Sequence, residues 1–88
     1  MRGLLGRKGL AEGEGILLRP AGSIHTFFMR FAIDAVFVDH DLVVVGIERS
    51  LGPWRIASRR DAKAVVELGS GECQRHGIEI GDALAVAA

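Results

Sequence analysis

The segment from Ile24 to Asp39, IHTFFMRFAIDAVFVD, determines how the rest of the chain is interpreted. It holds all four phenylalanines of the protein and is strongly apolar. Four side chains that form strong polar contacts interrupt it, namely His25, Thr26, Arg30 and Asp34. Because buried polar groups must be hydrogen-bonded or paired, this mixture predicts either a buried polar network or a binding pocket.

The same segment predicts two β-strands with a bend near Arg30. Residues 33–38 are expected to form the second of these strands. Asp39 to Asp41 has the composition of a tight turn, and residues 42–47 are β-branched and apolar on both faces, which is typical of a central strand. The pair 33–38 and 42–47 is therefore predicted to be a hairpin.

The remaining elements are expected to be short. Residues 16–19 and 62–68 have strand composition, and a turn at Gly81-Asp82 precedes a last strand at 83–87. Residues 50–61 show little periodicity and are predicted to be a long loop, which in a compact domain is often functional. Leucines 4, 5 and 10 fit a short helix.

A second short helix is predicted after Ser70. Ser70 is a good N-cap residue, and Gly77 would end the helix in a left-handed conformation. Parallel sheets need longer helical connections than this chain offers. The sequence therefore predicts one α+β, mainly β domain over residues 1–88. We expect a small antiparallel curved sheet or barrel of five to seven short strands with one or two short helices.

Composition narrows the expected partners and location. The 11 basic and 11 acidic residues balance, so no global field draws the protein to nucleic acid or to a membrane. Cys73 is the one cysteine, which excludes a disulfide within the chain and fits a reducing compartment. No apolar stretch reaches the ~20 residues that span a bilayer. We expect a cytoplasmic monomer or weak homodimer with no membrane partner, and nucleic acid is not the favoured partner.

Several motifs follow one another in order along nearly the whole chain. They are Gly3–Arg7, Gly13–Leu18, Ile24–Phe31, Ile33-Asp34, Pro53-Trp54-Arg55, Ala62–Leu68 and Gly77–Asp82. Together they resemble the bacterial and archaeal family called domain of unknown function 192. The resemblance implies a small, mostly β fold and supplies no activity, substrate or cofactor.

Within that family pattern, the central block carries over to His25, Thr26, Met29 and Asp34, and the closing turn to Gly81-Asp82. Two departures are visible. Many relatives have extra residues before the segment that matches Gly3, and from this we expect an edge strand to be missing or exposed. Many also have a proline where this chain has Ala32, so the bend after Phe31 is less rigidly fixed.

A catalytic interpretation starts from His25 and Asp34, because a histidine held by a carboxylate can act as a general base. The candidate nucleophiles, Ser23, Ser58 and Cys73, lack the surroundings of an activated nucleophile. The competing interpretation is that these polar groups satisfy the backbone where the sheet bends. Arg30 is the nearest cation to Asp34, so a plain ion pair is favoured over an arginine that receives an anionic ligand.

Two further motifs suggest ligands, and neither is favoured. Asp39-His40-Asp41 offers metal-binding groups, but three adjacent residues on a turn cannot converge on one ion, so we expect no metal and no cofactor. The stretch from Trp54 to Lys63 combines an aromatic side chain with arginines, as single-stranded nucleic-acid sites do. The neutral chain and the lack of a second aromatic residue nearby argue against that function.

The sequence thus favours a small-molecule or peptide-binding accessory module with a polar pocket on the 24–39 strand pair. The candidate binding residues are His25, Thr26, Met29, Arg30, Asp34 and Trp54. Two alternatives stay open: a hydrolytic or transfer enzyme that uses His25 and Asp34 as an acid–base pair, and a partner-binding or nucleic-acid-binding small barrel. The sequence alone does not decide whether the protein is an enzyme.

Overall fold

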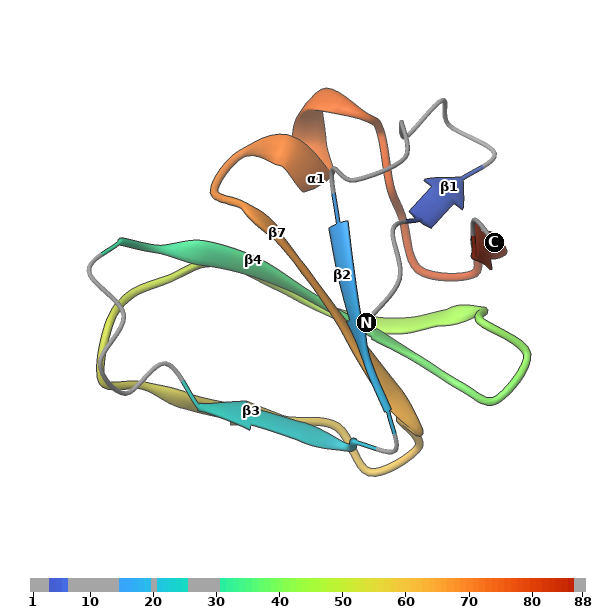
Figure 1. Cartoon of the computed structure of the whole chain (residues 1–88), viewed down its shortest axis with the longest axis horizontal. Helices are drawn as coiled ribbons and strands as arrows, with labels where there is room; N and C mark the ends of the chain where they lie inside the picture. Colours follow the sequence, from blue (N-terminus) through green and yellow to red (C-terminus); the bar gives the residue numbers. More distant parts are fainter. Residues whose placement is uncertain (1–3, 7–14, 20, 26–30, 87–88) are drawn as a thin grey trace.

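The structure is a computed structural model that describes residues 4–6, 15–19, 21–25 and 31–86. This part of the chain forms eight short strands and one helix (Figure 1). The elements are β1 (Leu4–Gly6), β2 (Gly15–Leu18), β3 (Ser23–His25), β4 (Ile33–Val38), β5 (Val44–Leu51), β6 (Ile56–Ser58), β7 (Ala64–Gly69), α1 (Glu72–Arg75) and β8 (Leu84–Val86). The α+β, mainly β class is confirmed, with eight strands where five to seven were expected.

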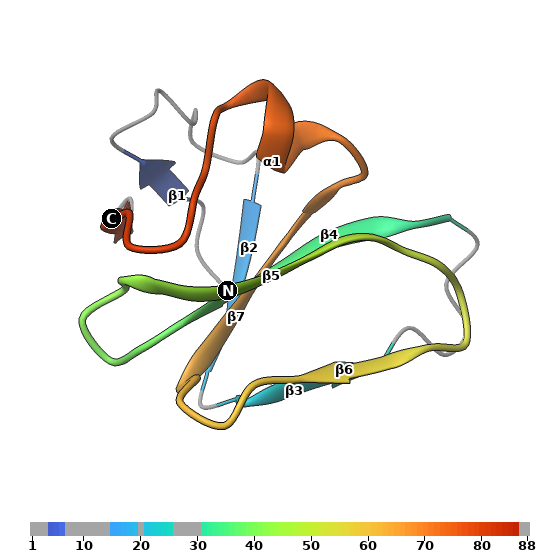
Figure 2. The ribbon, with the colours of Figure 1, turned by 180° about the vertical axis from the view of Figure 1, so that it is seen from behind.

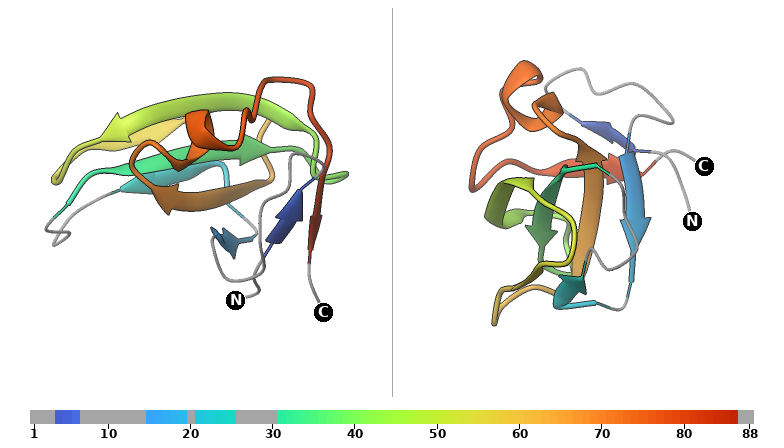
Figure 3. Two further views of the ribbon diagram at one scale, coloured as in Figure 1. Left: turned by 90° about the horizontal axis from the view of Figure 1, so that it is seen from above. Right: turned by 90° about the vertical axis from the view of Figure 1, so that its left-hand side faces the viewer.

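All strand pairs are antiparallel, and they are nested along the chain. β4 pairs with β5, β3 with β6, β2 with β7 and β1 with β8. β4 also pairs with β7, which creates a curved four-stranded sheet in the order β2-β7-β4-β5 (Figure 3). β1–β8 and β3–β6 are separate two-stranded ribbons, so the described strands do not close into a barrel.

The predicted hairpin at 33–38 and 42–47 is confirmed by β4 and β5. β5 is longer than predicted, and the prediction that it is central is wrong, because it lies at an edge of the sheet. The two interior strands are β7 and β4, and all six residues of β4 are buried. At its first residue, β5 is bonded to the segment before β8, because Val44 exchanges backbone hydrogen bonds with Gly81 and Asp82.

Two other predictions were wrong for a common reason. Residues 50–61, expected to be a loop, contain the end of β5 and all of β6. Residues 4–6, expected in a helix, form β1. Both β1 and β6 are only three residues long and are defined by distant partners, β8 and β3. A three-residue strand has no room for a periodic pattern, so local sequence could not identify it.

Two hydrophobic cores lie on the two faces of the four-stranded sheet. Val36, Val38 and Cys73 belong to the first core, under helix α1. Ala35, Phe37 and neighbouring apolar residues belong to the second core, which is completed by Ile24 and Ala57 from the β3–β6 ribbon. Figure 1 shows this order, with α1 above the sheet and the ribbon below it. Alternation along β4 therefore sends successive side chains into different cores.

Helix α1 is a single turn, shorter than the two turns predicted. Gly71, with φ 90°, is its N-cap residue, so the prediction of Ser70 is wrong. The Ser70 hydroxyl instead forms a hydrogen bond of 2.7 Å with the Ser50 hydroxyl. Gly77 has φ 65° and confirms the left-handed stop. The Gly81-Asp82 turn is also confirmed, since Gly81 has φ 97° and Asp82 binds the backbone of Glu79.

Candidate functional site

Asp34 is a buried carboxylate held by the backbone. It is 1% exposed and is the one buried charged residue in the described ranges. Its Oδ1 accepts a hydrogen bond from the Ser50 N–H at 2.8 Å. Its Oδ2 accepts hydrogen bonds from the N–H groups of Gly71 at 3.1 Å and Cys73 at 2.9 Å. Asp34 therefore joins β4, β5 and the start of α1 through one side chain.

A β-bulge explains why a carboxylate is needed at this position. The register pairs Ala35 with Glu48 and Ile33 with Leu51, so β5 places two residues opposite Asp34. A bulge of this kind leaves backbone groups without a partner in the ladder. Ser50 has a positive φ of 50° in this bulge, and its N–H turns to the Asp34 carboxylate. The geometry thus supports the interpretation in which Asp34 satisfies the backbone where the sheet bends.

The other predicted site residues lie at one end of the molecule or outside the described ranges. Trp54 is in the turn between β5 and β6 and is 60% exposed. His25 is the last residue of β3 and lies opposite Ile56 in the register. Thr26, Met29 and Arg30 are outside the described residues. Asp34 points toward α1, on the face of β4 opposite the β3–β6 ribbon.

Strand register brings two connections of the chain together at this end. The β3–β4 connection runs from His25 to Ile33, and the β5–β6 turn runs from Leu51 to Ile56. His25 is paired with Ile56, and Ile33 is paired with Leu51. Both ends of one connection therefore lie beside both ends of the other, as seen at the left of Figure 1 and from behind in Figure 2. We call the described residues 31–32 and 52–56 the Trp54 end.

The Trp54 end exposes three large apolar side chains. Phe31 is 64% exposed, Trp54 60% and Ile56 69%. Single exposed apolar residues are common on protein surfaces, whereas several at one end often mark an interaction site. Trp54 was predicted, but Phe31 and Ile56 were not, because both were expected within apolar or loop segments whose exposure local sequence does not reveal.

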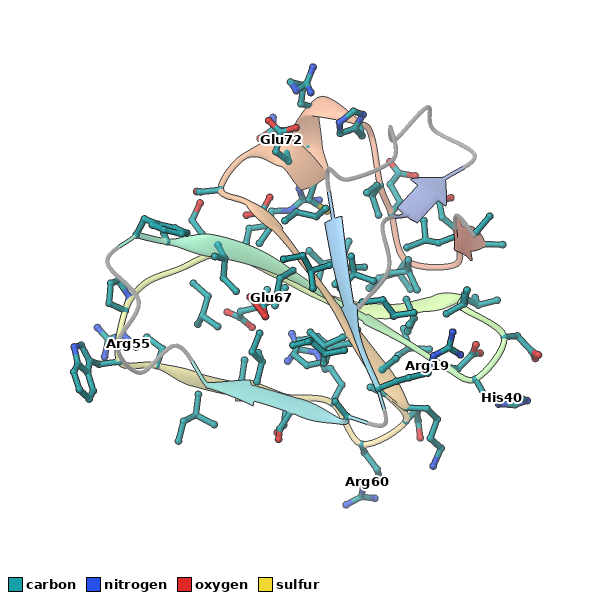
Figure 4. The ribbon with its side chains drawn as sticks, in the orientation of Figure 1. Arg19, His40, Arg55, Arg60, Glu67 and Glu72 are labelled. Atoms are coloured by element: carbon teal, nitrogen blue, oxygen red, sulfur yellow. The ribbon has the colours of Figure 1, made fainter. Side chains whose placement is uncertain are left out.

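The same end is free of acidic residues. The residues of this end, 31–32 and 52–56, include Arg55 and no aspartate or glutamate. Figure 4 shows Arg55 at the left of the molecule, in the β5–β6 turn. The charge balance of the whole chain therefore hides a local excess of positive charge, which attracts anionic groups.

Arg59 links the β3–β6 ribbon to the four-stranded sheet, and sequence reasoning missed it. Its Nη2 donates to the Ile47 carbonyl at 3.3 Å and to Glu48 Oε2 at 3.1 Å. Its guanidinium lies 5.1 Å from the centre of the Phe37 ring. Gly46 makes room for this contact, because a Cβ there would lie 2.6 Å from Arg59 Nε. A glycine in a strand interior was the one available signal, since it often marks a close approach.

Glu67 is a half-buried acid on the side of the sheet that faces the ribbon (Figure 4). It is paired with Ala35 in the register, and burial raises the pKa of its carboxyl group. Ala35 is paired with Glu48 on its other side, but Glu48 is bound to Arg59. Among the described residues, these acids do not form a group of three metal ligands.

The remaining candidates have local roles. Asp39 Oδ1 accepts hydrogen bonds from the N–H groups of Asp41 and Val43 at the hairpin turn. These bonds, that of Val43 above all, lower the pKa of Asp39. Cys73 is fully buried, and burial raises the pKa of its thiol. Within the described ranges, no helix is long and apolar enough to cross a membrane. The expected cytoplasmic location and the single-domain assignment stay predictions.

Comparison with known proteins places these features in a family. The model of the family described as Uncharacterized ACR, domain of unknown function 192, matches residues 1–86. A UPF0127 protein of Pyrococcus furiosus is 40% identical over 67 residues, which cover 75% of this chain and 57% of that protein. A UPF0127 protein of Pyrococcus abyssi is 39% identical over 61 residues, covering 68% and 51%. The chain therefore spans little more than half the length of these curated relatives.

Two solved structures share the fold. A protein of unknown function from Novosphingobium aromaticivorans has a TM-score of 0.72 and 26% identity, over 93% of this chain and 64% of that one. A protein of Sinorhizobium meliloti, for which a role as a transcription regulator has been suggested, has a TM-score of 0.68 and 23% identity, over 84% and 57%. The second likeness concerns the fold alone. From the match over residues 1–86, the chain belongs to the family of domain of unknown function 192.

Proposed function

We propose that this protein is a binding module for peptide segments or small ligands, and that the Trp54 end is its binding surface. The observation that carries the proposal is the exposure of Phe31, Trp54 and Ile56 at one end of the molecule. Exposed tryptophan is a frequent anchor of binding surfaces, because its large ring has few rotatable bonds to immobilise.

The backbone at Trp54 supports this proposal. Trp54 has φ 61°, a left-handed conformation that costs a non-glycine residue about 1–3 kcal/mol. Ser50, four residues earlier, is also left-handed and is held by Asp34. Strain of this kind persists where the surrounding structure holds it and is frequent at ligand sites. Asp34 would then act from inside the fold, by fixing the strand that leads to Trp54.

The other candidate residues stay in the proposed surface because of their place in the chain. Thr26, Met29 and Arg30 belong to the segment that joins β3 to β4, and both ends of that segment lie beside the turn that carries Trp54. His25 is the last residue before that segment. The proposal therefore combines Trp54 with the central block of the family pattern.

Two alternatives are less well supported. Acid–base catalysis would need the Asp34 carboxylate to reach a substrate, but the residue is 1% exposed and its oxygens accept three backbone hydrogen bonds. Single-stranded nucleic acid would find two exposed aromatic residues, Phe31 and Trp54, to stack on. The formal net charge of zero argues against it, because phosphate contacts dominate that kind of affinity.

A peptide selection tests the proposal. A library of random linear 12-residue peptides would be selected on the wild-type protein, and enriched peptides would be titrated while the fluorescence of Trp54, the one tryptophan, is recorded. We expect saturable changes in the wild type. For the variants, the fluorescence anisotropy of a dye-labelled peptide replaces the tryptophan signal, and it should show at least tenfold weaker binding to Trp54→Ala and Ile56→Ser. The matched control is Ile80→Ser, because Ile80 is 68% exposed and lies outside the Trp54 end. Equal losses of affinity in all three variants would overturn the proposal. So would a peptide selection that enriches no sequence together with a metabolite screen that finds no ligand.

A further inference from the structure

Strand β6 has a partner on one side only. It pairs with β3, and these two strands form a separate ribbon. β5 precedes β6 and is joined to it by a short turn, yet the two strands are not paired. Among the described residues, the second edge of β6 therefore faces no other strand. Such an edge is a template for an added strand.

The hydrogen bonds between β3 and β6 show which backbone groups of β6 point away from β3. The Arg59 N–H donates to the Gly22 carbonyl at 3.0 Å, in the register that also pairs Ile24 with Ala57. In an antiparallel pair, hydrogen-bonded and non-hydrogen-bonded positions alternate. Ala57 therefore bonds to β3, whereas the peptide groups of Ile56 and Ser58 point away from it. Of these, the Ser58 carbonyl accepts a hydrogen bond from Arg59 Nη1 at 2.8 Å.

The side chains along β6 alternate in the same way. Ile56 and Ser58 are exposed, and Ala57 between them is buried in the second core. Trp54 lies just before the strand and is also exposed. An added strand would therefore meet apolar surface at the Trp54 end and a hydroxyl group further along.

Positive charge brackets this edge. Arg55 lies immediately before β6 and Arg60 shortly after it, and Figure 4 shows them at its two ends. Segment 50–60 contains no acidic residue, and Asp61 is the first one after it. Complementary charge steers partners and fixes their register. A partner with acidic residues beside apolar ones would match this pattern.

We infer that the edge of β6 opposite β3, which faces no strand in the described part of the chain, binds an extended acidic segment of a partner protein as an additional strand. This inference rests on the proposed function and names the class of ligand. Main-chain hydrogen bonds to the N–H and C=O of Ile56 and to the N–H of Ser58 provide the affinity, as in other cases of strand addition, while the Ser58 carbonyl stays bonded to Arg59. Apolar side chains of the segment contact Ile56 and Trp54, and its carboxylates face Arg55 and Arg60. Single-stranded nucleic acid fits less well, because it does not use a row of peptide groups.

Backbone methylation tests the hydrogen-bond ladder. The probe is a capped seven-residue peptide of alternating glutamate and valine, titrated against Trp54 fluorescence. Methylating the peptide nitrogens of one alternating set should weaken binding at least tenfold, and methylating the other set should change it less than twofold. A lysine–valine analogue should bind at least tenfold more weakly than the glutamate–valine probe.

Variants of the protein test the same ladder from the other side. Ile56→Pro removes a donor that does not bond to β3, and it should weaken binding more than Ile56→Ala, which keeps the N–H. Thermal unfolding checks that each variant is folded, and the methylated peptides decide the question if the proline variant is not.

Three outcomes would overturn the inference. In the first, the glutamate–valine probe fails to bind while library peptides bind in a Trp54-dependent way, which leaves the proposed function standing. In the second, the probe binds with equal affinity whichever set is methylated. In the third, an oligothymidylate binds in a Trp54-dependent way and the peptides do not. The inferred ligand would then be nucleic acid, and the proposed function would be overturned as well.

Discussion

Replacing Asp34 by asparagine tests the role of this side chain with little change in volume. In the wild type, Oδ2 accepts hydrogen bonds from Gly71 and Cys73, and Oδ1 accepts one from Ser50. The amide of asparagine has one oxygen and one NH₂ group. If the oxygen keeps Gly71 and Cys73, the NH₂ group faces the N–H of Ser50, donor against donor.

The expected cost follows from the bonds that are lost. A hydrogen bond to a charged group contributes about 1.5–3 kcal/mol, and a buried donor left without an acceptor costs about 1–3 kcal/mol. Asp34→Asn should therefore lower the free energy of unfolding by about 2–3 kcal/mol, and Asp34→Ala by about 3–6 kcal/mol. A domain of 88 residues has roughly 4–13 kcal/mol in total. The alanine variant is thus expected to be close to unfolding.

Thermal unfolding followed by circular dichroism measures the effect. A loss of 2–3 kcal/mol should lower Tm by about 8–20 °C in a domain of this size. The matched control is Asp41→Asn, because the Asp41 side chain is 71% exposed; it should change stability by less than about 0.5 kcal/mol. If Asp34→Asn kept the Tm of the wild type and lost the binding of Trp54-dependent peptides, Asp34 would be a binding residue and the structural role would be refuted.

Three further measurements probe other parts of the fold. Burial raises the pKa of Glu67 above its ordinary value of 4.5, so its contribution to stability is full below pH 4.5 and is lost as the pH rises through the raised pKa. In urea unfolding measured at several pH values, Glu67→Gln should flatten the dependence of stability on pH in this range. An unchanged pH dependence would contradict a raised pKa at Glu67. Cys73 is fully buried and its pKa is raised, so an aromatic disulfide reagent at pH 8 should react at least about 100-fold faster in urea than with the folded protein. Gly77→Ala should lower the free energy of unfolding by about 1 kcal/mol, because φ of Gly77 is 65°. The control is Gly52→Ala, where a Cβ meets nothing within 4 Å and the loss should be less than about 0.5 kcal/mol. Equal losses would exclude the left-handed conformation as the cause of the destabilisation at Gly77.

The sequence was most informative where pattern and turn chemistry agreed. The hairpin of β4 and β5 combines two β-branched segments with an Asp39 turn, and Asp39 does accept the N–H groups of Asp41 and Val43. Gly77 and Gly81 marked the ends of elements because only a residue without a Cβ adopts their positive φ cheaply. These features depend on residues close in sequence, so they could be predicted.

The features that sequence missed depend on distant partners. The bulge opposite Asp34 is created by register between β4 and β5, and the carboxylate reaches donors 37 and 39 residues away. Arg59 crosses to β5 only because Gly46 leaves space above Phe37. The polar residues within the apolar segment 24–39 did indicate that Asp34 is important. The groups that donate hydrogen bonds to Asp34 are all backbone N–H groups, which every residue except proline has, so the sequence could not identify them.

The candidate site shows the same division. Trp54 was singled out because an aromatic residue stands among arginines in a stretch of little periodicity. Phe31 and Ile56 join it only through the pairing of His25 with Ile56 and of Ile33 with Leu51. That pairing places a second exposed aromatic residue, Phe31, at the same end of the molecule as Trp54. Sequence could therefore name one residue of the proposed surface but not the other exposed residues that accompany it.

The nested order of the strand pairs has a consequence for how the chain reaches its native state. β4 and β5 are close neighbours in sequence, whereas Leu4 of β1 is paired with Val86 of β8. Closing a longer loop costs more entropy, and contacts distant along the chain slow the search for them. We expect the inner hairpin to nucleate first and the β1–β8 pair to form last. During synthesis, residue 86 must therefore emerge from the ribosome before the outermost strand pair can form.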